Sequence, residues 1–243
     1  MDDAMKKTLS IVVPCRNEER RLAGRRRVFS GFLKEAGRLS GTKAEMVIEE
    51  DGSTDRTPEI IDSFSKQDPC IKAVHCRKGL GKGGGMALGV EKSSGEFVVM
   101  CDADLPFSPR DVARMANLLE KNDLVIPNRR HPESKNVKVP FLRLLFSRVF
   151  GAYVNLLLGL GISDTQAGAK AFRREAFEVI RPRRFLSYSM DVEMLFRAKR
   201  AGLRIAEVPA EHRHGKDERF NWLFDGPRML LDILEMRLSL SSF

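Results

Sequence analysis

Several features that mark large classes of protein are missing from this sequence. The cysteines, which are Cys15, Cys70, Cys76 and Cys101, form no C-x-x-C pair, so we expect no disulfide framework and infer a reducing compartment. No stretch of about eighteen apolar residues occurs, so no helix is expected to span a bilayer. Residues 1–8 are polar and lack the apolar segment of a signal peptide.

The composition narrows the partners further. With 42% hydrophobic and 31% charged residues, a chain of 243 residues suits one large α/β domain. The formal net charge of +9 favours nucleic acid, an anionic membrane surface or a phosphorylated substrate. A nucleic-acid-binding module would need a binding motif or a basic strand studded with aromatic residues, and neither is found. We therefore expect no nucleic acid as a partner.

Short apolar segments alternate with helical stretches in the first part of the chain. Strands are predicted at residues 9–13, 44–49, 71–75, 97–100 and 123–127. Such alternation predicts an α/β fold with a mostly parallel central sheet, right-handed crossovers and flanking helices. Ligands of such sheets lie at the carboxyl ends of the strands, so the loops that follow the strands are the candidate functional segments.

The most informative of these loops follows the buried strand 97–100. It carries Asp102 and Asp104, and residues two apart in an extended chain project to the same side. Two like charges at one place repel unless a cation lies between them, and a hard divalent metal that also binds a diphosphate would provide it. The alternative is a surface turn that leads into the helix expected near Ser108.

Glycine and cationic residues gather at residues 77–87. The segment is not a P-loop, because the Gly-x-x-x-x spacing before Gly-Lys and the following Ser or Thr are missing. It still suits an anionic ligand at the beginning of a helix, with Lys82 and Arg77 as its cations. The alternative is a flexible surface loop with solvated lysines.

Polar loops also follow the first two strands. Residues 15–19 read Cys-Arg-Asn-Glu-Glu, and residues 50–55 read Glu-Asp-Gly-Ser-Thr-Asp. Asp51 could accept hydrogen bonds from a base or a ribose, whereas residues 53–55 can cap the next helix. For residues 16–19 a helix cap, with acids in the first turn, is the alternative to a ligand site.

Taken in order, these motifs resemble the nucleotide-sugar domain of inverting family 2 glycosyltransferases, which have the GT-A fold. Residues 164–174, Asp-Thr-Gln-Ala-Gly-Ala-Lys-Ala-Phe-Arg-Arg, are similar to a segment of dolichyl-phosphate glucosyltransferases, whereas mannosyl relatives usually have Thr-Ser-Gly-Phe-Arg there. Residues 190–195 and 205–209 resemble later segments of the same enzymes. The resemblance covers residues 9–213.

The resemblance implies transfer of a hexose from a nucleoside diphosphate to a polyprenyl or dolichyl phosphate. UDP-glucose is the expected donor, with GDP-mannose as the main competitor, and Mg²⁺ or Mn²⁺ would be held by Asp102 and Asp104. The implied donor-binding residues are Pro14, Glu18, Asp51, Lys82, Asp102, Ala103 and Asp104. A second alternative is a family 2 transferase that acts on a sugar hydroxyl.

Asp104, Arg129 and Asp191 are the implied catalytic residues. Asp191 occupies the position of the usual family base, but a phosphate acceptor is already an anion and needs little deprotonation. We therefore expect Asp191 to orient the donor or a basic residue. The alternative is an ordinary acid in the first turn of the helix expected at residues 191–201.

The acceptor phosphate requires cations of its own. Arg143 and Ser147 lie four residues apart on a predicted helix and therefore on one face. Mannosyl relatives hold the lipid phosphate with an Arg-x-x-x-Ser pair and an arginine after the preceding strand, which implies Arg143, Ser147 and Arg129 here. Arg148 and Lys170 are weaker candidates, and solvated basic side chains are the alternative for each arginine.

Two later segments suggest contact with a membrane surface. Residues 141–160 are apolar but interrupted by polar side chains, which fits an interfacial amphipathic helix or, alternatively, a core helix packed on the sheet. We expect a glycosyltransferase domain at residues 1–215, with a donor half (1–127) and an acceptor half (128–215). An amphipathic C-terminal segment, residues 216–243, would follow and would lie on the membrane or, alternatively, form a dimer contact. The expected location is cytoplasmic, peripheral on the cytosolic face of a membrane.

The sequence departs from the family pattern at three places. Glu49-Glu50-Asp51 replaces the usual Val-Asp-Asp and keeps one of its two aspartates. Pro106 stands where mannosyl enzymes carry a glutamine that binds the metal, so water and diphosphate oxygens would have to complete the coordination. Ala169 replaces a phenylalanine of the glucosyl enzymes.

Overall fold

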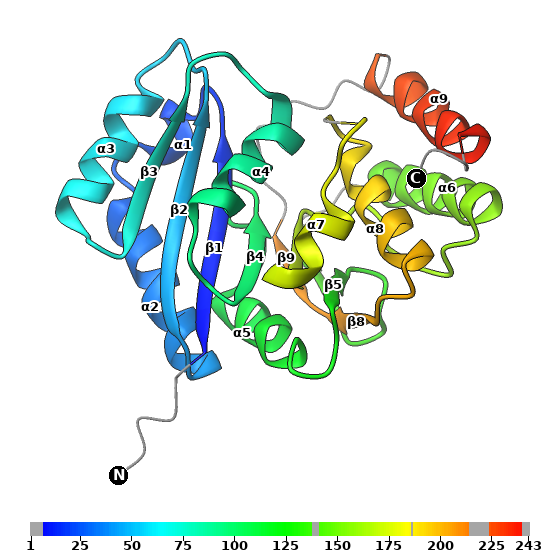
Figure 1. The fold of residues 1–243 in the computed structure, drawn as a ribbon, viewed down its shortest axis with the longest axis horizontal. Coiled ribbons are helices and arrows are strands. Elements are labelled where there is room, and N and C mark those ends of the chain that lie inside the picture. Colours follow the sequence, from blue (N-terminus) through cyan, green and yellow to red (C-terminus); the bar gives the residue numbers. More distant parts are fainter. Residues whose placement is uncertain (1–6, 138–140, 186, 214–223, 240–243) are drawn as a thin grey trace.

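The computed structural model describes residues 7–137, 141–185, 187–213 and 224–239, without the side chains of residues 136–137, 141–144 and 212–213. Within this part, one sheet of seven strands has the order β3-β2-β1-β4-β7-β5-β8 (Figure 1). The strands are β1 (Thr8–Cys15), β2 (Lys43–Asp51), β3 (Ile71–Cys76), β4 (Phe97–Cys101), β5 (Leu124–Asn128), β7 (Ala169–Arg173) and β8 (Ile205–Pro209). All run parallel except β7, which pairs antiparallel with both β4 and β5.

Helices cover both faces of the sheet. They are α1 (Glu19–Leu22), α2 (Arg26–Ser40), α3 (Thr57–Gln67), α4 (Gly81–Lys92), α5 (Pro109–Leu118), α6 (Phe141–Leu158), α7 (Phe177–Ile180), α8 (Met190–Arg200) and α9 (Asp225–Leu238), with a 3₁₀ turn at Arg174–Ala176. A small parallel pair, β6 (Lys135–Val137) and β9 (Glu211–Arg213), lies apart from the main sheet. The fold class predicted from the sequence is confirmed.

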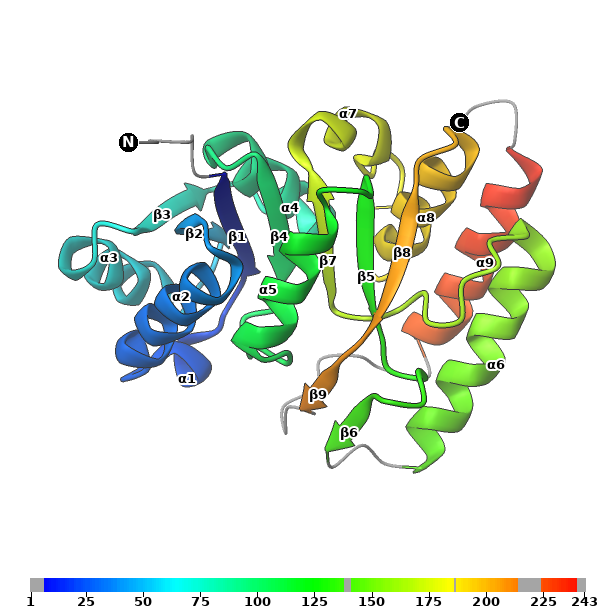
Figure 2. The same cartoon turned by 90° about the horizontal axis from the view of Figure 1, so that it is seen from below.

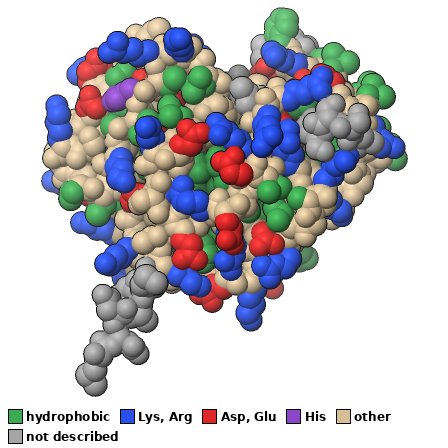
Figure 3. Space-filling model, viewed as in Figure 1, with side chains coloured by type: hydrophobic (Ala, Val, Ile, Leu, Met, Phe, Trp, Pro, Cys, Tyr) green, Lys and Arg blue, Asp and Glu red, His purple; other side chains and the backbone are tan. Residues whose placement is uncertain are grey.

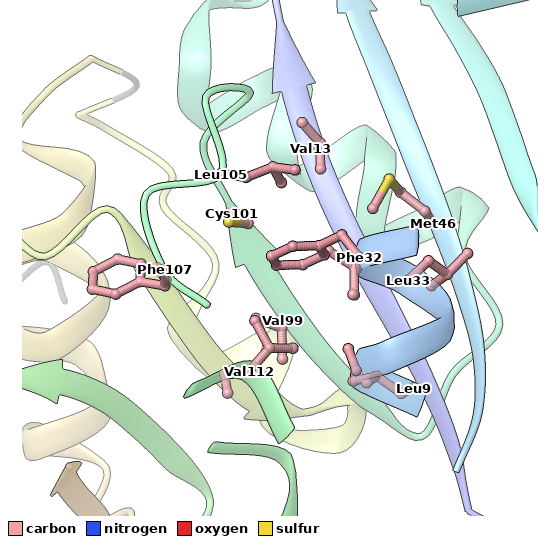
Figure 4. Packing of buried hydrophobic residues seen from close by; sticks show 14 of the residues in the cluster. Leu9, Val13, Phe32, Leu33, Met46, Val99, Cys101, Leu105, Phe107 and Val112 are labelled. Carbon is pink, nitrogen blue, oxygen red and sulfur yellow. The ribbon is translucent and has the colours of Figure 1, made fainter. Parts of the chain in front are cut away.

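The alternation of side chains along β1 divides the core into two clusters. Leu9, Ile11 and Val13 face the cluster under α2, α3 and α5, whereas Val12 faces the cluster under α4, α7 and α8. Figure 4 shows part of the first cluster, in which Phe32 and Leu33 of α2 lie over the sheet. Both faces of β1 and β4 are therefore buried, as the continuous apolar runs of these strands predict.

Three boundaries differ from the predicted ones for identifiable reasons. β1 continues past Pro14 to Cys15, because proline is tolerated near the end of a strand. The single helix expected before Gly37 is broken into α1 and α2 at Gly24, which has a φ of +70°. α4 begins at Gly81 rather than at Met86, so the glycine-rich segment is itself the first turn of the helix.

Helices α6 and α9 lie side by side at one end of the molecule (Figure 2). The Tyr153 hydroxyl of α6 donates a hydrogen bond to the Leu230 carbonyl of α9 at 3.1 Å. None of the helices described here combines the length and hydropathy needed to cross a bilayer. Of the expected C-terminal segment 216–243, residues 224–239 are described and contain α9; the remainder lies outside the described residues.

Candidate functional site

The candidate site lies where the carboxyl ends of β1, β2, β4 and β5 meet. Because β7 runs antiparallel, its first residue, Ala169, pairs with Cys101 at the end of β4. The segment before β7 therefore reaches the same edge of the sheet. The space-filling view is notched at its upper edge, between the lobe of α1–α3 and the lobe of α6 and α9 (Figure 3).

The predicted carboxylate pair stands on a turn. β4 ends at Cys101, and the Leu105 amide donates to the Asp102 carbonyl at 2.9 Å, with Leu105 at a φ of +54°. The extended-strand geometry expected for Asp102 and Asp104 is therefore wrong, and the surface-turn alternative describes the backbone better. The two charges still interact: burial and the charge of Asp102 raise the pKa of Asp104, although Arg21 and Lys82 oppose this shift.

Lys82, at the beginning of α4, binds one member of this pair. Its Nζ lies 2.8 Å from Asp102 Oδ1, and the side chain is 31% exposed. Burial would lower the pKa of Lys82, but the charges of Asp102 and Asp191 outweigh burial and raise it. On the other side of Asp102, a Cβ at Gly168 would clash with Oδ2, so a larger residue there would displace the Asp102 carboxylate.

Asp191, in the first turn of α8, is paired with a buried lysine. Lys170 Nζ lies 2.5 Å from Asp191 Oδ1 and also donates to the Ala167 carbonyl at 3.2 Å. The Lys170 side chain is 1% exposed. The contact with Lys170 fixes the position of the Asp191 carboxylate, which agrees with the expected orienting role of Asp191.

Arg129, directly after β5, binds Asp164. Two parallel hydrogen bonds of 2.7 and 2.8 Å join the side chains, and the Arg129 amide adds a third at 2.9 Å. Burial would raise the pKa of Asp164, but Arg129 outweighs burial and lowers it. The charges of Asp191 and Asp102 also act on Arg129, so the arginine lies close to the predicted site.

Arg130 was not predicted, and the structure places it beside Ser147. Its guanidinium donates to Ser147 Oγ at 3.1 Å and also to the Ser147 and Ser163 carbonyls. A Cβ at Gly151 would lie 2.9 Å from Arg130 Nη1, so α6 approaches the arginine closely. The tandem of arginines after the strand was the available signal. Burial lowers the pKa of Arg130.

Two of the other predicted donor residues, Asp51 and Glu18, have partners within the protein. The carboxylate of Asp51 accepts hydrogen bonds from the Gly81 amide at 2.8 Å and from the Leu80 amide, so it caps the beginning of α4. Glu18 is buried and pairs with Arg21 at 3.1 Å. Pro14 lies at the end of β1, and Ala103 is buried in the turn between the two aspartates.

Two predicted acceptor residues are less well placed by the structure. Arg143 belongs to α6, but its side chain lies outside the described residues. Arg148 is exposed on α6, and its charge acts on Arg130. The structure therefore brings together Lys82, Asp102, Asp104, Arg129, Lys170 and Asp191, whereas it places Ser147 with Arg130.

Comparison with known proteins identifies several relatives. "Glycosyltransferase AglD" of Haloferax volcanii is 32% identical over 89% of this chain and 35% of its own length, so this chain spans about a third of that protein. "Dolichyl-phosphate beta-glucosyltransferase" of Dictyostelium discoideum is 31% identical over 94% of this chain and 73% of its length. "Undecaprenyl-phosphate mannosyltransferase" of Micrococcus luteus is 32% identical over 69% of this chain and 71% of its length.

A solved structure supports the fold. Glucosyl-3-phosphoglycerate synthase from Mycobacterium tuberculosis, crystallised with Mn²⁺, UDP and glucosyl-3-phosphoglycerate, matches with a TM-score of 0.70 at 20% identity. The match covers 95% of this chain and 80% of the other. The family described as Glycosyl transferase family 2 matches residues 10–181. The chain belongs to this family, and it is a glycosyltransferase with the GT-A fold.

Proposed function

We propose that the protein transfers glucose from UDP-glucose to a polyprenyl or dolichyl phosphate, with inversion at the anomeric carbon. The observation that carries the proposal is the arrangement of charge at the end of β4. Burial and the charge of Asp102 raise the pKa of Asp104, with Lys82 bound to Asp102 on one side and the Arg129–Asp164 pair nearby. The names of the relatives from Dictyostelium and Micrococcus support a lipid-phosphate acceptor.

The carboxylate pair fits a hard divalent cation. Asp102 and Asp104 supply oxygen ligands, and the charge of Asp102 raises the pKa of Asp104, so a cation between them would relieve that repulsion. In the described part of the chain, no three His, Cys, Asp or Glu side chains form a metal-binding group, so water and diphosphate oxygens would complete the coordination. Mg²⁺ or Mn²⁺ bound there would neutralise charge on the departing diphosphate.

The protein's own residues would bind and orient the donor. Lys82 would place a cation beside the diphosphate, at the first turn of a helix whose amide groups favour anions. Pro14, Glu18 and Ala103 would line the nucleoside pocket. Asp51 would contact the nucleoside through the loop whose shape it already fixes by capping α4.

An acceptor phosphate needs positive charge more than it needs a base. Arg129, Arg143 and Ser147 would bind it, and the Lys170–Asp191 pair would hold a fixed cation beside them. A sugar-hydroxyl acceptor would instead require Asp191 to remove a proton, which its pairing with Lys170 opposes. The same pairing thus favours the phosphate acceptor over the hydroxyl acceptor.

The surface of α6 and α9 would contact the membrane that carries the lipid. Hydrophobic side chains gather along the outer edge of the lobe that contains both helices (Figure 3). The exposed ones are Leu145, Phe146, Val149, Leu156, Phe224, Leu230, Leu231, Leu234 and Leu238. Arg228 and Arg237 are exposed on α9 and would add attraction to anionic lipids. In this proposal residues 1–127 form the donor half and residues 128–215 form the acceptor half. The C-terminal segment, residues 216–243, lies on the cytosolic face of the membrane, and the protein is cytoplasmic.

A panel of donors and metals tests the proposal. Thermal stability would be measured with UDP-glucose, UDP-galactose, GDP-mannose, UDP and GDP, each with Mg²⁺, Mn²⁺ or a chelator. A ligand that binds the folded state raises the melting temperature, so UDP-glucose with metal should give the largest rise. Transfer of radiolabelled glucose to dolichyl phosphate in detergent is the second readout. A larger rise with GDP-mannose, followed by mannose transfer, would replace the proposed donor.

A further inference from the structure

Two buried polar atoms next to the site have no hydrogen-bond partner in the part of the chain that the structure describes. The hydroxyl Oγ1 of Thr165 and the amide Nε2 of Gln166 are buried, and neither has a hydrogen-bond partner among the described residues. Both belong to the segment between α6 and β7. Buried polar groups are nearly always hydrogen-bonded, so two adjacent exceptions call for an explanation.

The segment of these two residues contacts three charged side chains of the site. Asp164 binds Arg129, the Ala167 carbonyl accepts from Lys170, and Gly168 lies against the carboxylate of Asp102. Thr165 and Gln166 stand between these contacts. The segment is therefore held on both sides, and the two unpaired atoms lie within a span that contacts Arg129, Lys170 and Asp102.

The side chain of Gln166 is suited to hydrogen-bond a hydroxyl group. Its amide can donate two hydrogen bonds and accept two, and it carries no charge. The diphosphate would be bound by cations, whereas the hexose attached to it offers only neutral hydroxyl groups. The side chain is half-buried, and the terminal torsion of glutamine is soft, so the amide can turn toward a ligand without moving the backbone.

We infer that Gln166, with Thr165 beside it, hydrogen-bonds a hydroxyl group of the donor hexose and thereby determines which hexose is transferred. The inference rests on the proposed function, because it assumes a sugar nucleotide at the carboxylate pair. It adds a specificity residue that is independent of the nucleotide. A site built to pair with a hydroxyl discriminates strongly, because the wrong epimer leaves its buried polar groups unpaired.

The test compares hexoses that differ at one carbon. The values of kcat/KM would be measured for UDP-glucose, UDP-galactose and UDP-mannose in the wild type, Gln166→Ala and Thr165→Val. Gln166→Ala should lower kcat/KM for UDP-glucose by about 10- to 100-fold and reduce the preference over one epimer by a similar factor. The affinity for UDP alone, measured by calorimetry, should stay within about twofold, because UDP has no hexose to lose a contact.

The controls separate a specificity role from a structural one. Gln67→Ala changes an exposed glutamine at the end of α3. It should leave unchanged the ratios of kcat/KM for UDP-glucose to those for UDP-galactose and UDP-mannose. If Gln166→Ala and Thr165→Val raise the melting temperature and leave the epimer ratios unchanged, the unpaired groups are structural and the inference is wrong. If the wild type transfers no hexose from any of these donors and binds no UDP, the proposed function itself fails.

Discussion

Residues 1–127 and residues 128–215, which we propose as the donor half and the acceptor half, hold their charged side chains in different ways. In the donor half, backbone hydrogen bonds position the charged side chains: a turn carries Asp102 and Asp104, and Asp51 caps the helix that begins beside Lys82. In the acceptor half, side chains hold one another over long distances along the chain, as in Arg129–Asp164 and Lys170–Asp191.

The balance of charge differs as well. At the end of β4, burial and the neighbouring charge of Asp102 raise the pKa of Asp104, against the opposing charges of Arg21 and Lys82. In residues 128–215, Arg129 and Lys170 already have carboxylate partners. A bound divalent cation would therefore add missing charge to the donor half, whereas an acceptor phosphate would have to share Arg129 with Asp164. The two halves should respond differently to substitution.

The largest effect is expected from Asp104→Asn in the donor half. The substitution keeps the size of the side chain but removes a charge that would hold the metal, so transfer should fall by about 1000-fold or more. The measurement is kcat for glucose transfer at saturating Mg²⁺, together with the melting temperature. Because the pKa of Asp104 is raised by burial and by Asp102, the variant should be at least as stable as the wild type.

Asp123→Asn is the matched control for this prediction. Asp123 precedes β5 at the opposite edge of the sheet and binds Arg204, so its loss should leave transfer unchanged. Near-normal transfer by Asp104→Asn would remove the carboxylate pair from the mechanism and, with it, the contrast in charge between the two halves.

Arg129→Ala tests the acceptor half, where stability and function are joined in one pair. The substitution leaves Asp164 buried, at 1% exposure, without its bidentate partner and should cost about 3–5 kcal/mol of unfolding free energy. The double variant Arg129→Ala/Asp164→Asn should recover most of this loss. The KM for dolichyl phosphate should remain raised in both variants, whereas the affinity for UDP-glucose should not change.

Arg204→Ala is the control, because Arg204 also binds an aspartate bidentately but is 61% exposed. Exposed pairs contribute about 0–1 kcal/mol, so its effect on unfolding should be small. An unchanged KM for the lipid in the double variant would assign Arg129 a purely structural role.

The same contrast explains what the sequence could predict. The strands, the acids at the end of β4 and the cation at Lys82 follow from local patterns of apolar, acidic and glycine residues. The structure confirms the strands and shows Lys82 bound to Asp102. The extended geometry expected for Asp102 and Asp104 was wrong, and the turn was only the alternative. Apolar residues alone do not mark where a strand ends, and β4 ends at Cys101.

Pairings across the chain could not be predicted in the same way. Arg130 and Ser147 are 17 residues apart, and Lys170 and Asp191 are 21 apart. Both pairs depend on how α6, β7 and α8 pack, and β7 reverses the direction that the alternation of strands and helices suggests. The family resemblance supplied Asp191 and Ser147 as candidates, and only the packing shows which cation each one contacts.

A smaller effect is expected at the surface of α6 and α9. Leu231 and Leu238 are 66% and 76% exposed, so changing both to Asp should leave the fold intact. Binding to vesicles of phosphatidylcholine with anionic phospholipid should weaken by about 10- to 100-fold, since each leucine contributes about 1.5–3 kcal/mol when fully buried. Co-sedimentation with vesicles measures the change.

Val28→Asp, on α2 at the other end of the molecule, is the control for this surface, because Val28 is 49% exposed. It should leave vesicle binding unchanged. Equal binding by the double leucine variant and the wild type would contradict a membrane contact through α9. A change in the concentration dependence of the molecular mass would point instead to contact between two copies.

The smallest expected effect concerns Glu49, where the donor half breaks its own pattern. The carboxyl is buried on β2, and among the described residues neither of its oxygens has a hydrogen-bond partner. Burial and the charges of Asp51 and Glu50 raise its pKa from 4.5 to about 8. The folded state therefore holds a proton that the unfolded chain releases, so stability should fall as the pH rises from about 4.5 to about 8.

Glu49→Val should remove this part of the pH dependence and raise the melting temperature at pH 8 by about 2–8 °C, because an unpaired buried polar group costs about 1–3 kcal/mol.

A second substitution, at Gly85, makes the test more specific. A Cβ at Gly85 would clash with Glu49 Oε2, so Gly85→Ala alone should destabilise the protein. With Val at position 49 the clash is relieved, and alanine gains helix propensity of about 1 kcal/mol. The double variant should therefore be more stable than the sum of the single changes. If the stability changes of Glu49→Val and Gly85→Ala instead add up in the double variant at every pH from 5 to 8, the Glu49 carboxyl does not lie against α4 as a protonated group.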